Sequence, residues 1–225
     1  MNTKKFVVFD LDGTLIDTLS GITLALNRTL LECGYKKCDY TKEEVKHFIG
    51  GGARRLFRLG TQKDEIDEKE YSLYCKYYEY YQPVSECFPN VINVLHALKS
   101  KGYELFIFSN KPHELLLKLC ELKFEKGLFT YIQGQEECYP PKPDVTALNK
   151  VLHMFNLDPK DGYYVGDSKF DVLTSRNANL KSVIYKGGYG FIDDILVTKP
   201  DYLFSDYNEL KEIIKWHVAK NMFMD

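Results

Sequence analysis

The stretch FVVFDLDGTLIDT, residues 6–18, places two aspartates, Asp10 and Asp12, at the end of an uninterrupted apolar run. Such a run, without alternating polar residues, is typical of a strand buried on both faces. Carboxylates are costly in that position unless something pairs with them. Since residues two apart on a strand point to the same side, we expect the two aspartates to converge where the strand ends. On this stretch alone, a turn with solvated acids stays an alternative.

The composition is that of an ordinary globular protein, with 44% hydrophobic and 28% charged residues in 225. This length suits one sizeable domain, or one domain with a smaller insert. A net charge of −2 offers no broad basic field to neutralise phosphates, so we expect no nucleic-acid partner. The apolar run before Asp10 is too short for a signal core or a membrane span, so we expect no membrane partner.

The cysteines are scattered and form no C-x-x-C pair. This pattern favours neither a zinc site nor a disulfide framework. We therefore expect reduced thiols and a cytoplasmic location for the six residues Cys33, Cys38, Cys75, Cys87, Cys120 and Cys138.

The rest of the chain divides into a helical part and an alternating part. Residues 18–85 carry helical periodicity, with a capping-box start at TKEE, residues 41–44. After Pro89, apolar strand patterns alternate with helical ones, which predicts a parallel sheet covered on both faces. We predict an α/β, Rossmann-like core of residues 1–17 and 86–225, with an inserted all-helical cap of residues 18–85. The later strands are expected at YELFIFSN (103–110), FTYIQG (129–134), GYYVGDS (162–168), SVIYK (182–186) and DYLFSD (201–206).

Polar residues follow several of these strands, where sites form in open α/β sheets. Besides the first two aspartates, the strand ends supply Ser109 and Asn110, and then Asp167 with Asp171 one turn later. Four carboxylates in one crevice repel each other unless a cation lies among them. Oxygen ligands without His or Cys suit Mg²⁺. A lysine held between prolines in YPPKPD (139–144), Lys142, can present a fixed positive charge to the same crevice.

This set of residues fits phosphoryl transfer. Mg²⁺, a lysine and hydrogen-bond donors neutralise the oxygens of an incoming phosphate. One aspartate can attack phosphorus and form an aspartyl-phosphate. A second acid can protonate the leaving oxygen and then activate water.

Four of these segments resemble, in order, the motifs of the haloacid dehalogenase superfamily: DLDGT (10–14), SN (109–110), Lys142 and GDSKFD (166–171). The resemblance implies a Mg²⁺-dependent phosphatase. Asp10 would be the nucleophile and Asp12 the acid/base. Ser109 and Asn110 would bind phosphate, Thr14 would help to hold the geometry of the phosphate site, and Lys142 would anchor the phosphate. The metal would be held by Asp10, Asp167 and the backbone carbonyl of Asp12, with Asp171 either supporting the metal or starting a helix.

An acid at Asp12 also favours ester hydrolysis over dehalogenation, because a halide leaves without a proton.

The helical insert occupies the place of the family's cap, which closes over the site and selects the substrate. Its stretch IGGGARRLF (49–57) resembles the substrate-reading loop of phosphoglycolate phosphatases, as do FSNKP (108–112) and YKGGYG (185–190). The resemblance implies a small phosphorylated substrate, with 2-phosphoglycolate as the first expectation. Gly51 would let the backbone approach it, and Arg54 or Arg55 would pair with its carboxylate. Alternatively, both arginines are solvated on a cap helix.

Other functions stay open at this point. The close rivals are a pyrophosphatase and a sugar-phosphate phosphatase. A phosphomutase of the β-phosphoglucomutase type is disfavoured by Thr14, where that group typically has valine. A non-catalytic binder would be expected to lose some of the site residues. Departures from the family pattern at CFPNV (87–91), Lys169 and Asn179 weaken the substrate assignment more than the reaction type. The tyrosine-rich stretch 71–82 is interpreted as cap packing, with ring stacking on a nucleotide as the alternative. A monomer and a homodimer are both compatible with the sequence.

Overall fold

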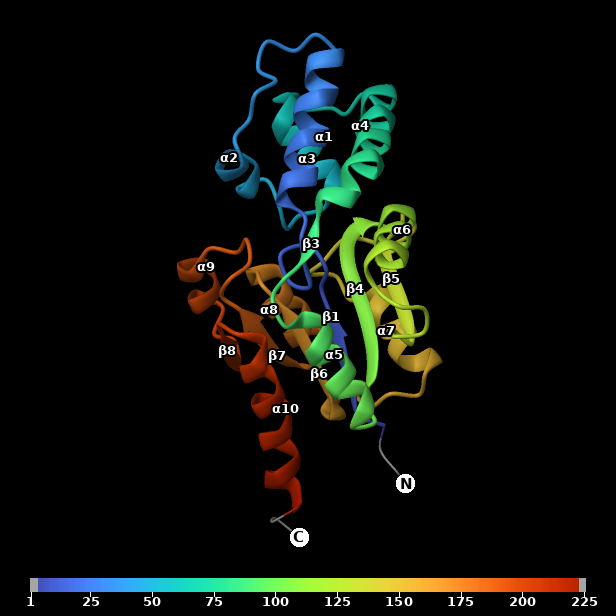
Figure 1. The fold of residues 1–225 in the computed structure, drawn as a ribbon, viewed down its shortest axis with the longest axis vertical. Helices are drawn as coiled ribbons and strands as arrows, with labels where there is room; N and C mark the ends of the chain where they lie inside the picture. The colour runs from blue at the N-terminus through green and yellow to red at the C-terminus, as the bar shows by residue number, and fades with distance from the viewer. Residues whose placement is uncertain (1–3, 223–225) are drawn as a thin grey trace.

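The computed structural model describes residues 4–222, with side chains described as far as residue 214. Its core is a six-stranded sheet in the order β5-β4-β1-β6-β7-β8 (Figure 1), and every neighbouring pair is parallel. The predicted α/β architecture is confirmed. The strands are β1 (Phe6–Phe9), β4 (Glu104–Pro112), β5 (Tyr131–Gln135), β6 (Gly162–Gly166), β7 (Lys181–Tyr185) and β8 (Tyr202–Phe204).

The first strand lies inside the sheet, between β4 and β6, because all four of its residues are apolar and buried. Val7 and Phe9 belong to the apolar cluster on one face, and Phe6 and Val8 to the cluster on the other. This alternation is the two-residue period of a strand. The chain therefore delivers Asp10, which directly follows β1, to the middle of the sheet's carboxyl edge.

Helices cover both faces of the sheet (Figure 1). The cluster on one face includes residues of α5 (Val91–Ser100), α6 (His113–Lys123) and α10 (Tyr207–Met222). The other face packs against α7 (Thr146–Met154) and α8 (Lys169–Asn177). A short helix that the sequence patterns did not predict, α9 (Ile192–Val197), packs beside α8 through Ile195.

Residues 19–84 form a separate helical unit, which we call the cap. It contains α1 (Leu19–Glu32), α2 (Lys42–Lys46), α3 (Ala53–Thr61), α4 (Glu68–Tyr81) and a short 3₁₀ turn (Gln82–Val84). These helices enclose an apolar cluster that includes Leu26, Phe57 and Tyr74, and Leu115 of α6 also belongs to it. The predicted capping box is present, with the Thr41 side chain accepting from the Glu44 backbone and Glu44 accepting from the Thr41 backbone.

The chain enters and leaves the cap through a two-stranded antiparallel ribbon, formed by β2 (Ile16–Asp17) and β3 (Glu86–Cys87). A backbone hydrogen bond of 3.1 Å from Phe88 to Leu15 extends it. The sequence analysis did not predict this ribbon, because two-residue strands carry no readable periodicity. It lies at the ends of the predicted insert, residues 18–85, and the division into two domains stays a prediction.

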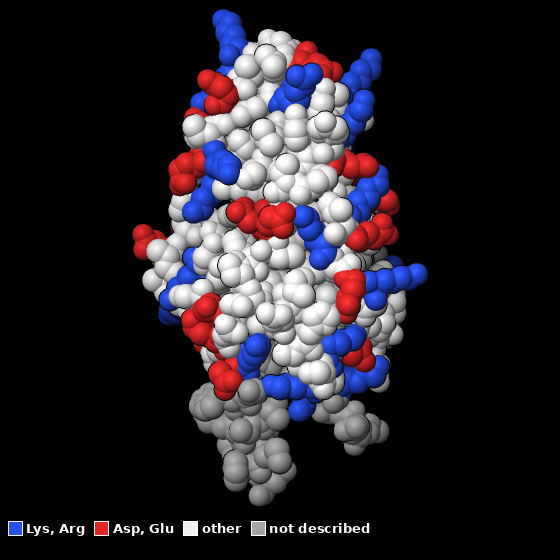
Figure 2. All heavy atoms as spheres, in the orientation of Figure 1, with Lys and Arg blue, Asp and Glu red and all other residues white. Residues whose placement is uncertain are grey.

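The surface carries interspersed charges. On the face shown in Figure 2, basic and acidic side chains alternate over both the cap and the core. Within residues 4–222, none of the helices combines the length and apolar content needed to cross a membrane. All six cysteines are free thiols, as the sequence analysis expected.

Truncating the cap core should destabilise the protein strongly. Leu26 is fully buried and lies so close to Gly60 that an added Cβ there would be 2.6 Å from a Leu26 methyl. We expect Leu26→Ala to lower the free energy of unfolding by about 2–5 kcal/mol, because it leaves a cavity. Leu24→Ala is the matched control, since Leu24 is 44% exposed on the same helix; its effect should stay within about 0.5 kcal/mol. Urea unfolding measures both, and equal losses would contradict the packing described.

Candidate active site

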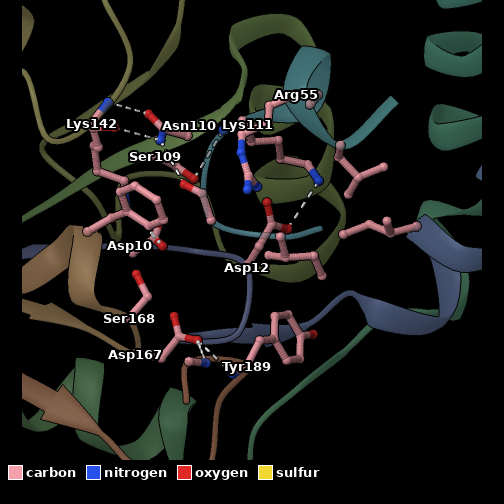
Figure 3. Close-up of a pocket in the computed structure, with 18 of the residues that line it drawn as sticks. Asp10, Asp12, Arg55, Ser109, Asn110, Lys111, Lys142, Asp167, Ser168 and Tyr189 are labelled. Carbon is pink, nitrogen blue, oxygen red and sulfur yellow. Dashed lines mark hydrogen bonds and ion pairs between the residues drawn. The ribbon is translucent and has the colours of Figure 1, made fainter. Parts of the chain in front are cut away.

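The carboxyl ends of β1, β4 and β6 meet beneath the cap and enclose a cavity of about 370 Å³. Core and cap residues both line it (Figure 3). The core contributes predicted site residues from four separate segments, which the fold brings together: Asp10, Asp12, Ser109, Asn110, Lys142 and Asp167.

Asp10 occupies the floor of this cavity. Its Oδ2 is 3.0 Å from Nζ of Lys142. Its Oδ1 is buried and has no hydrogen-bond partner among the described residues. Burial raises the pKa of Asp10 to about 6, against the opposing effect of the Lys142 charge. One oxygen of this carboxylate is therefore anchored, and the other is desolvated without compensation.

Lys142 is a buried cation shared by two carboxylates. Its Nζ is 3.0 Å from Asp10 and 2.7 Å from Asp171, and it also donates to the Tyr164 hydroxyl at 3.2 Å. The backbone N–H of Lys142 donates to Oδ1 of Asn110 at 2.7 Å. The sequence analysis expected Asn110 to bind phosphate. In the structure its amide oxygen holds the Lys142 loop, and its Nδ2 donates to the cap at Gly50 O, 3.0 Å away.

Asp167 is held by the loop after β1 and by the loop after β7. Oδ1 accepts from the Thr14 hydroxyl at 2.9 Å, and Oδ2 accepts from the backbone of Tyr189 at 2.7 Å. Burial is the main cause that raises the pKa of Asp167 to about 8, followed by the charges of Asp171 and Asp10. Thr14, which was predicted to belong to the phosphate site, is fully buried, and its hydroxyl holds the Asp167 carboxylate in place.

Position 188 must be glycine because its backbone lies directly against the Asp167 side chain. An added Cβ there would lie 2.4 Å from the Asp167 side chain and 2.3 Å from the Gly13 carbonyl. An added Cβ at Gly190 would likewise lie 2.1 Å from the Asp167 carbonyl, so packing around Asp167 requires two glycines of the stretch YKGGYG.

Asp171 is committed to protein donors. Oδ1 accepts from Lys142 at 2.7 Å, while Oδ2 accepts from the backbone of Asp167 and from both the backbone and the hydroxyl of Ser168. Asp171 and Ser168 form the capping box of α8. This arrangement fits the helix-start role that the sequence analysis left open, and it fixes the position of the Asp167 backbone.

The carboxylates fit a hard divalent cation. Oxygen atoms of Asp10, Asp167 and Asp171 lie within 4.8 Å of one another, and all three residues are buried. The unpartnered Oδ1 of Asp10 supplies an open ligand, and oxygen donors without His or Cys are those that Mg²⁺ prefers. Asp10 and Asp167 line the cavity and Asp171 does not, so Asp10 and Asp167 are the better candidates for direct ligands. A role for the Asp12 backbone carbonyl stays a prediction.

The Asp12 carboxylate turns away from this cluster, toward a lysine and a tyrosine that the sequence analysis did not single out. Its Oδ1 is 3.2 Å from Lys111 Nζ and 3.3 Å from the hydroxyl of Tyr78, which comes from α4 of the cap. Burial lowers the pKa of Lys111, and the Asp12 charge acts in the opposite direction. Lys111 lies within the quoted motif FSNKP, so a charged residue in a buried strand was the available signal.

The cap places only some of the expected residues at the cavity. Arg55 lines it together with Gly50 and Gly52, and its side chain points into the space above Asp12 (Figure 3). Arg54 lies outside the lining and forms a two-point ion pair with Glu68, at 2.7 and 2.9 Å. Gly51 is also outside the lining. The two arginines are thus separated, although they are adjacent in sequence.

Comparison with known proteins identifies the class. A family model described as haloacid dehalogenase-like hydrolase matches residues 7–185, and the chain belongs to this family. A phosphoglycolate phosphatase of Aquifex aeolicus is 32% identical, over 96% of this chain and 99% of its own length. Phosphoglycolate phosphatase 1 of Pseudomonas aeruginosa is 31% identical, over 92% and 78%. A crystal structure described as a predicted phosphoglycolate phosphatase from Haemophilus somnus superposes with a TM-score of 0.81 at 28% identity, over 95% of this chain and 99% of that one.

The raised acid pKa values predict how stability depends on pH in the metal-free protein. Unfolded aspartates titrate near pH 3.8, whereas folded Asp10 and Asp167 titrate near 6 and 8. Between these pH limits the folded chain binds more protons than the unfolded chain. The free energy of unfolding should therefore fall as the pH rises from about 4 to about 8.

Thermal unfolding in EDTA at several pH values measures this slope. Asp167→Asn should flatten it, because the substituted side chain no longer loses a proton. The exposed Asp64→Asn is the control and should keep the wild-type slope. Identical slopes in the wild type and Asp167→Asn would contradict the assignment.

Proposed function

We propose that this hydrolase is a Mg²⁺-dependent phosphatase, which cleaves a small phosphate monoester through an aspartyl-phosphate, with 2-phosphoglycolate as the expected substrate. One observation carries the proposal: the buried carboxylate of Asp10 is anchored by Lys142 on one oxygen and unpartnered on the other, at the floor of the cavity. A desolvated, oriented carboxylate is the form in which an aspartate acts as a nucleophile.

In the first step, an oxygen of Asp10 forms a bond to phosphorus as the ester bond to the leaving oxygen breaks. Lys142 keeps its positive charge beside the attacking carboxylate and offsets the negative charge of the phosphoryl group. Ser109 lines the cavity beside Asp10, where phosphate oxygens would lie. Mg²⁺ held by Asp10 and Asp167 would supply further positive charge to these oxygens.

Asp12 would serve both steps as acid and base. It gives a proton to the leaving oxygen in the first step, and it removes a proton from the attacking water in the second. Water then forms a bond to phosphorus as the bond to Asp10 breaks, which releases phosphate and regenerates the free carboxylate. The position of Asp12, two residues beyond the nucleophile and lining the same cavity, supports this assignment.

Arg55 is the better candidate for the residue that reads the substrate carboxylate. It lines the cavity from the cap, whereas the guanidinium group of Arg54 is already paired with Glu68. A guanidinium group matches a carboxylate with two parallel hydrogen bonds. The names of the relatives support 2-phosphoglycolate as the substrate. A cytoplasmic location and a monomeric or homodimeric state stay predictions.

Phosphate release with Mg²⁺ from a substrate panel tests the reaction and the substrate together. The panel contains 2-phosphoglycolate, pyrophosphate, β-glucose 1-phosphate, glucose 6-phosphate and p-nitrophenyl phosphate. Asp10→Asn should lower kcat by at least about 10³-fold while still binding ligand, because an amide is a poor nucleophile. The exposed Asp64→Asn is the control. Substantial turnover by Asp10→Asn would contradict the assignment of Asp10 as the nucleophile. A preference for pyrophosphate or a sugar phosphate would mean that this compound, and not 2-phosphoglycolate, is the substrate.

The paired variants Arg55→Ala and Arg54→Ala test substrate reading. Arg55→Ala should raise KM for 2-phosphoglycolate by about 10- to 100-fold, because a charge-assisted hydrogen bond contributes about 1.5–3 kcal/mol. KM for p-nitrophenyl phosphate, which lacks the carboxylate, should change little. Arg54→Ala should leave both constants near their wild-type values. A larger effect from Arg54→Ala would reverse the assignment.

A further inference from the structure

Lys111 is a buried cation that the proposed reaction does not yet use. It lies near the end of β4, and its side chain is 0% exposed. Ser109 precedes it by two positions, just as Asp10 precedes Asp12. Ser109 lines the cavity with Asp10, and Lys111 is paired with Asp12. The pairing between β4 and β5 shifts register between Phe108 and Pro112, and such irregularities re-aim side chains beside active sites.

The contacts of Lys111 form a closed three-way network. Its ammonium group is 3.2 Å from Oδ1 of Asp12, donates to the Tyr78 hydroxyl, and lies 3.7 Å from the centre of the Tyr78 ring. The Tyr78 hydroxyl in turn donates to the same Oδ1 of Asp12, at 3.3 Å. Burial raises the pKa of Tyr78 far above its usual value, so the hydroxyl keeps its proton. The network therefore joins a core strand, the Asp12 loop and a cap helix.

All of this network's contacts with Asp12 go to one oxygen. Within the described residues, Oδ1 accepts from both Lys111 and Tyr78, and Oδ2 has no protein partner. A carboxylate bonded through a single oxygen to two fixed groups cannot rotate freely. Its second oxygen is then held in one direction, in a cavity that the substrate must enter.

We propose that Lys111 is a positioning residue of the phosphatase reaction, which holds Oδ1 of Asp12 with the help of the Tyr78 hydroxyl and leaves Oδ2 to exchange the proton with the leaving oxygen. This inference rests on the proposed function. It assigns Lys111 an action through Asp12 and no bond to the reacting phosphoryl group. The loss of kcat/KM on removing the Lys111 charge should therefore depend on how much the leaving group needs a proton.

Phenyl phosphate and p-nitrophenyl phosphate test this dependence, because they are similar in shape and lack a carboxylate. Phenolate is a poor leaving group and benefits from protonation, whereas nitrophenolate leaves without it. kcat/KM reports the steps up to departure of the leaving group. In Lys111→Met, which keeps the length but removes the charge, kcat/KM for phenyl phosphate should fall by about 10²-fold. The value for p-nitrophenyl phosphate should fall by less than about tenfold.

Two hydroxyl deletions on one helix provide the matched comparison. Tyr78→Phe should show the same leaving-group dependence with a smaller loss, because it removes one of the two contacts to Oδ1. Tyr77→Phe is the control, because the Tyr77 hydroxyl contacts Glu32 and Arg28 on the outside of the cap. It should leave both constants unchanged.

A stability cycle tests the ion pair independently of turnover. Asp12→Asn removes the carboxylate that compensates the buried ammonium group, so its melting temperature should fall. Adding Lys111→Met to Asp12→Asn should raise the melting temperature above that of Asp12→Asn alone. Strictly additive losses would show that the two groups are not coupled and would overturn the inference.

The outcomes separate the two proposals. Equal losses with both esters in Lys111→Met would indicate a direct effect on phosphate or a purely structural role, and would overturn the inference alone. A wild-type enzyme that releases phosphate from no member of the substrate panel, 2-phosphoglycolate included, would contradict the proposed function, and the positioning role would fail with it. Both proposals are supported if Lys111→Met lowers kcat/KM for phenyl phosphate alone and if the melting temperatures of the Asp12 and Lys111 variants are not additive.

Discussion

The site depends on the burial of one ammonium group between two carboxylates. Lys142 bridges Asp10, at the end of β1, and Asp171, in the first turn of α8. Burying charges is costly unless geometry and hydrogen bonding are complete, and removing one partner leaves an uncompensated ion. Lys142 therefore requires the end of β1 and the start of α8 to be correctly placed. Asp171 extends the constraint, because its other oxygen accepts from the backbone of Asp167.

The same cluster holds more negative than positive charge. Three buried carboxylates, Asp10, Asp167 and Asp171, lie close together, and Lys142 contacts two of them. Burial raises the pKa values of Asp10 and Asp167, and the charges of neighbouring carboxylates raise them further, so that a proton is the available compensation in the metal-free protein. With Lys142 offsetting one of the three negative charges, a divalent cation would balance the other two and relieve the same repulsion.

The sequence predicted those parts of the site that follow from strand position. Parallel strands deliver their carboxyl ends to one edge, so Asp10, Ser109 and Asp167 could be brought together before any coordinates were known. Side-chain direction could not be predicted. Arg54 and Arg55 differ by about 100° around one helix, and only tertiary packing shows that Arg55 enters the cavity. Tyr78 lies in a tyrosine-rich helix whose members look alike in sequence. The ribbon of β2 and β3 was too short to carry a pattern.

Tyr189 shows why cap and core act as one site. Its backbone N–H donates to Asp167 at 2.7 Å. Its hydroxyl accepts from the backbone of Thr18 at 2.6 Å and of Leu19 at 2.9 Å, and donates to Asp17 at 2.7 Å. Unpaired N–H groups at a helix start need a partner, and Thr18 provides no side-chain cap for α1. One residue therefore both fixes a carboxylate of the candidate metal site and completes the first helix of the cap. A movement of the cap on its ribbon would strain this contact, so the position of the cap and the geometry of Asp167 are physically linked.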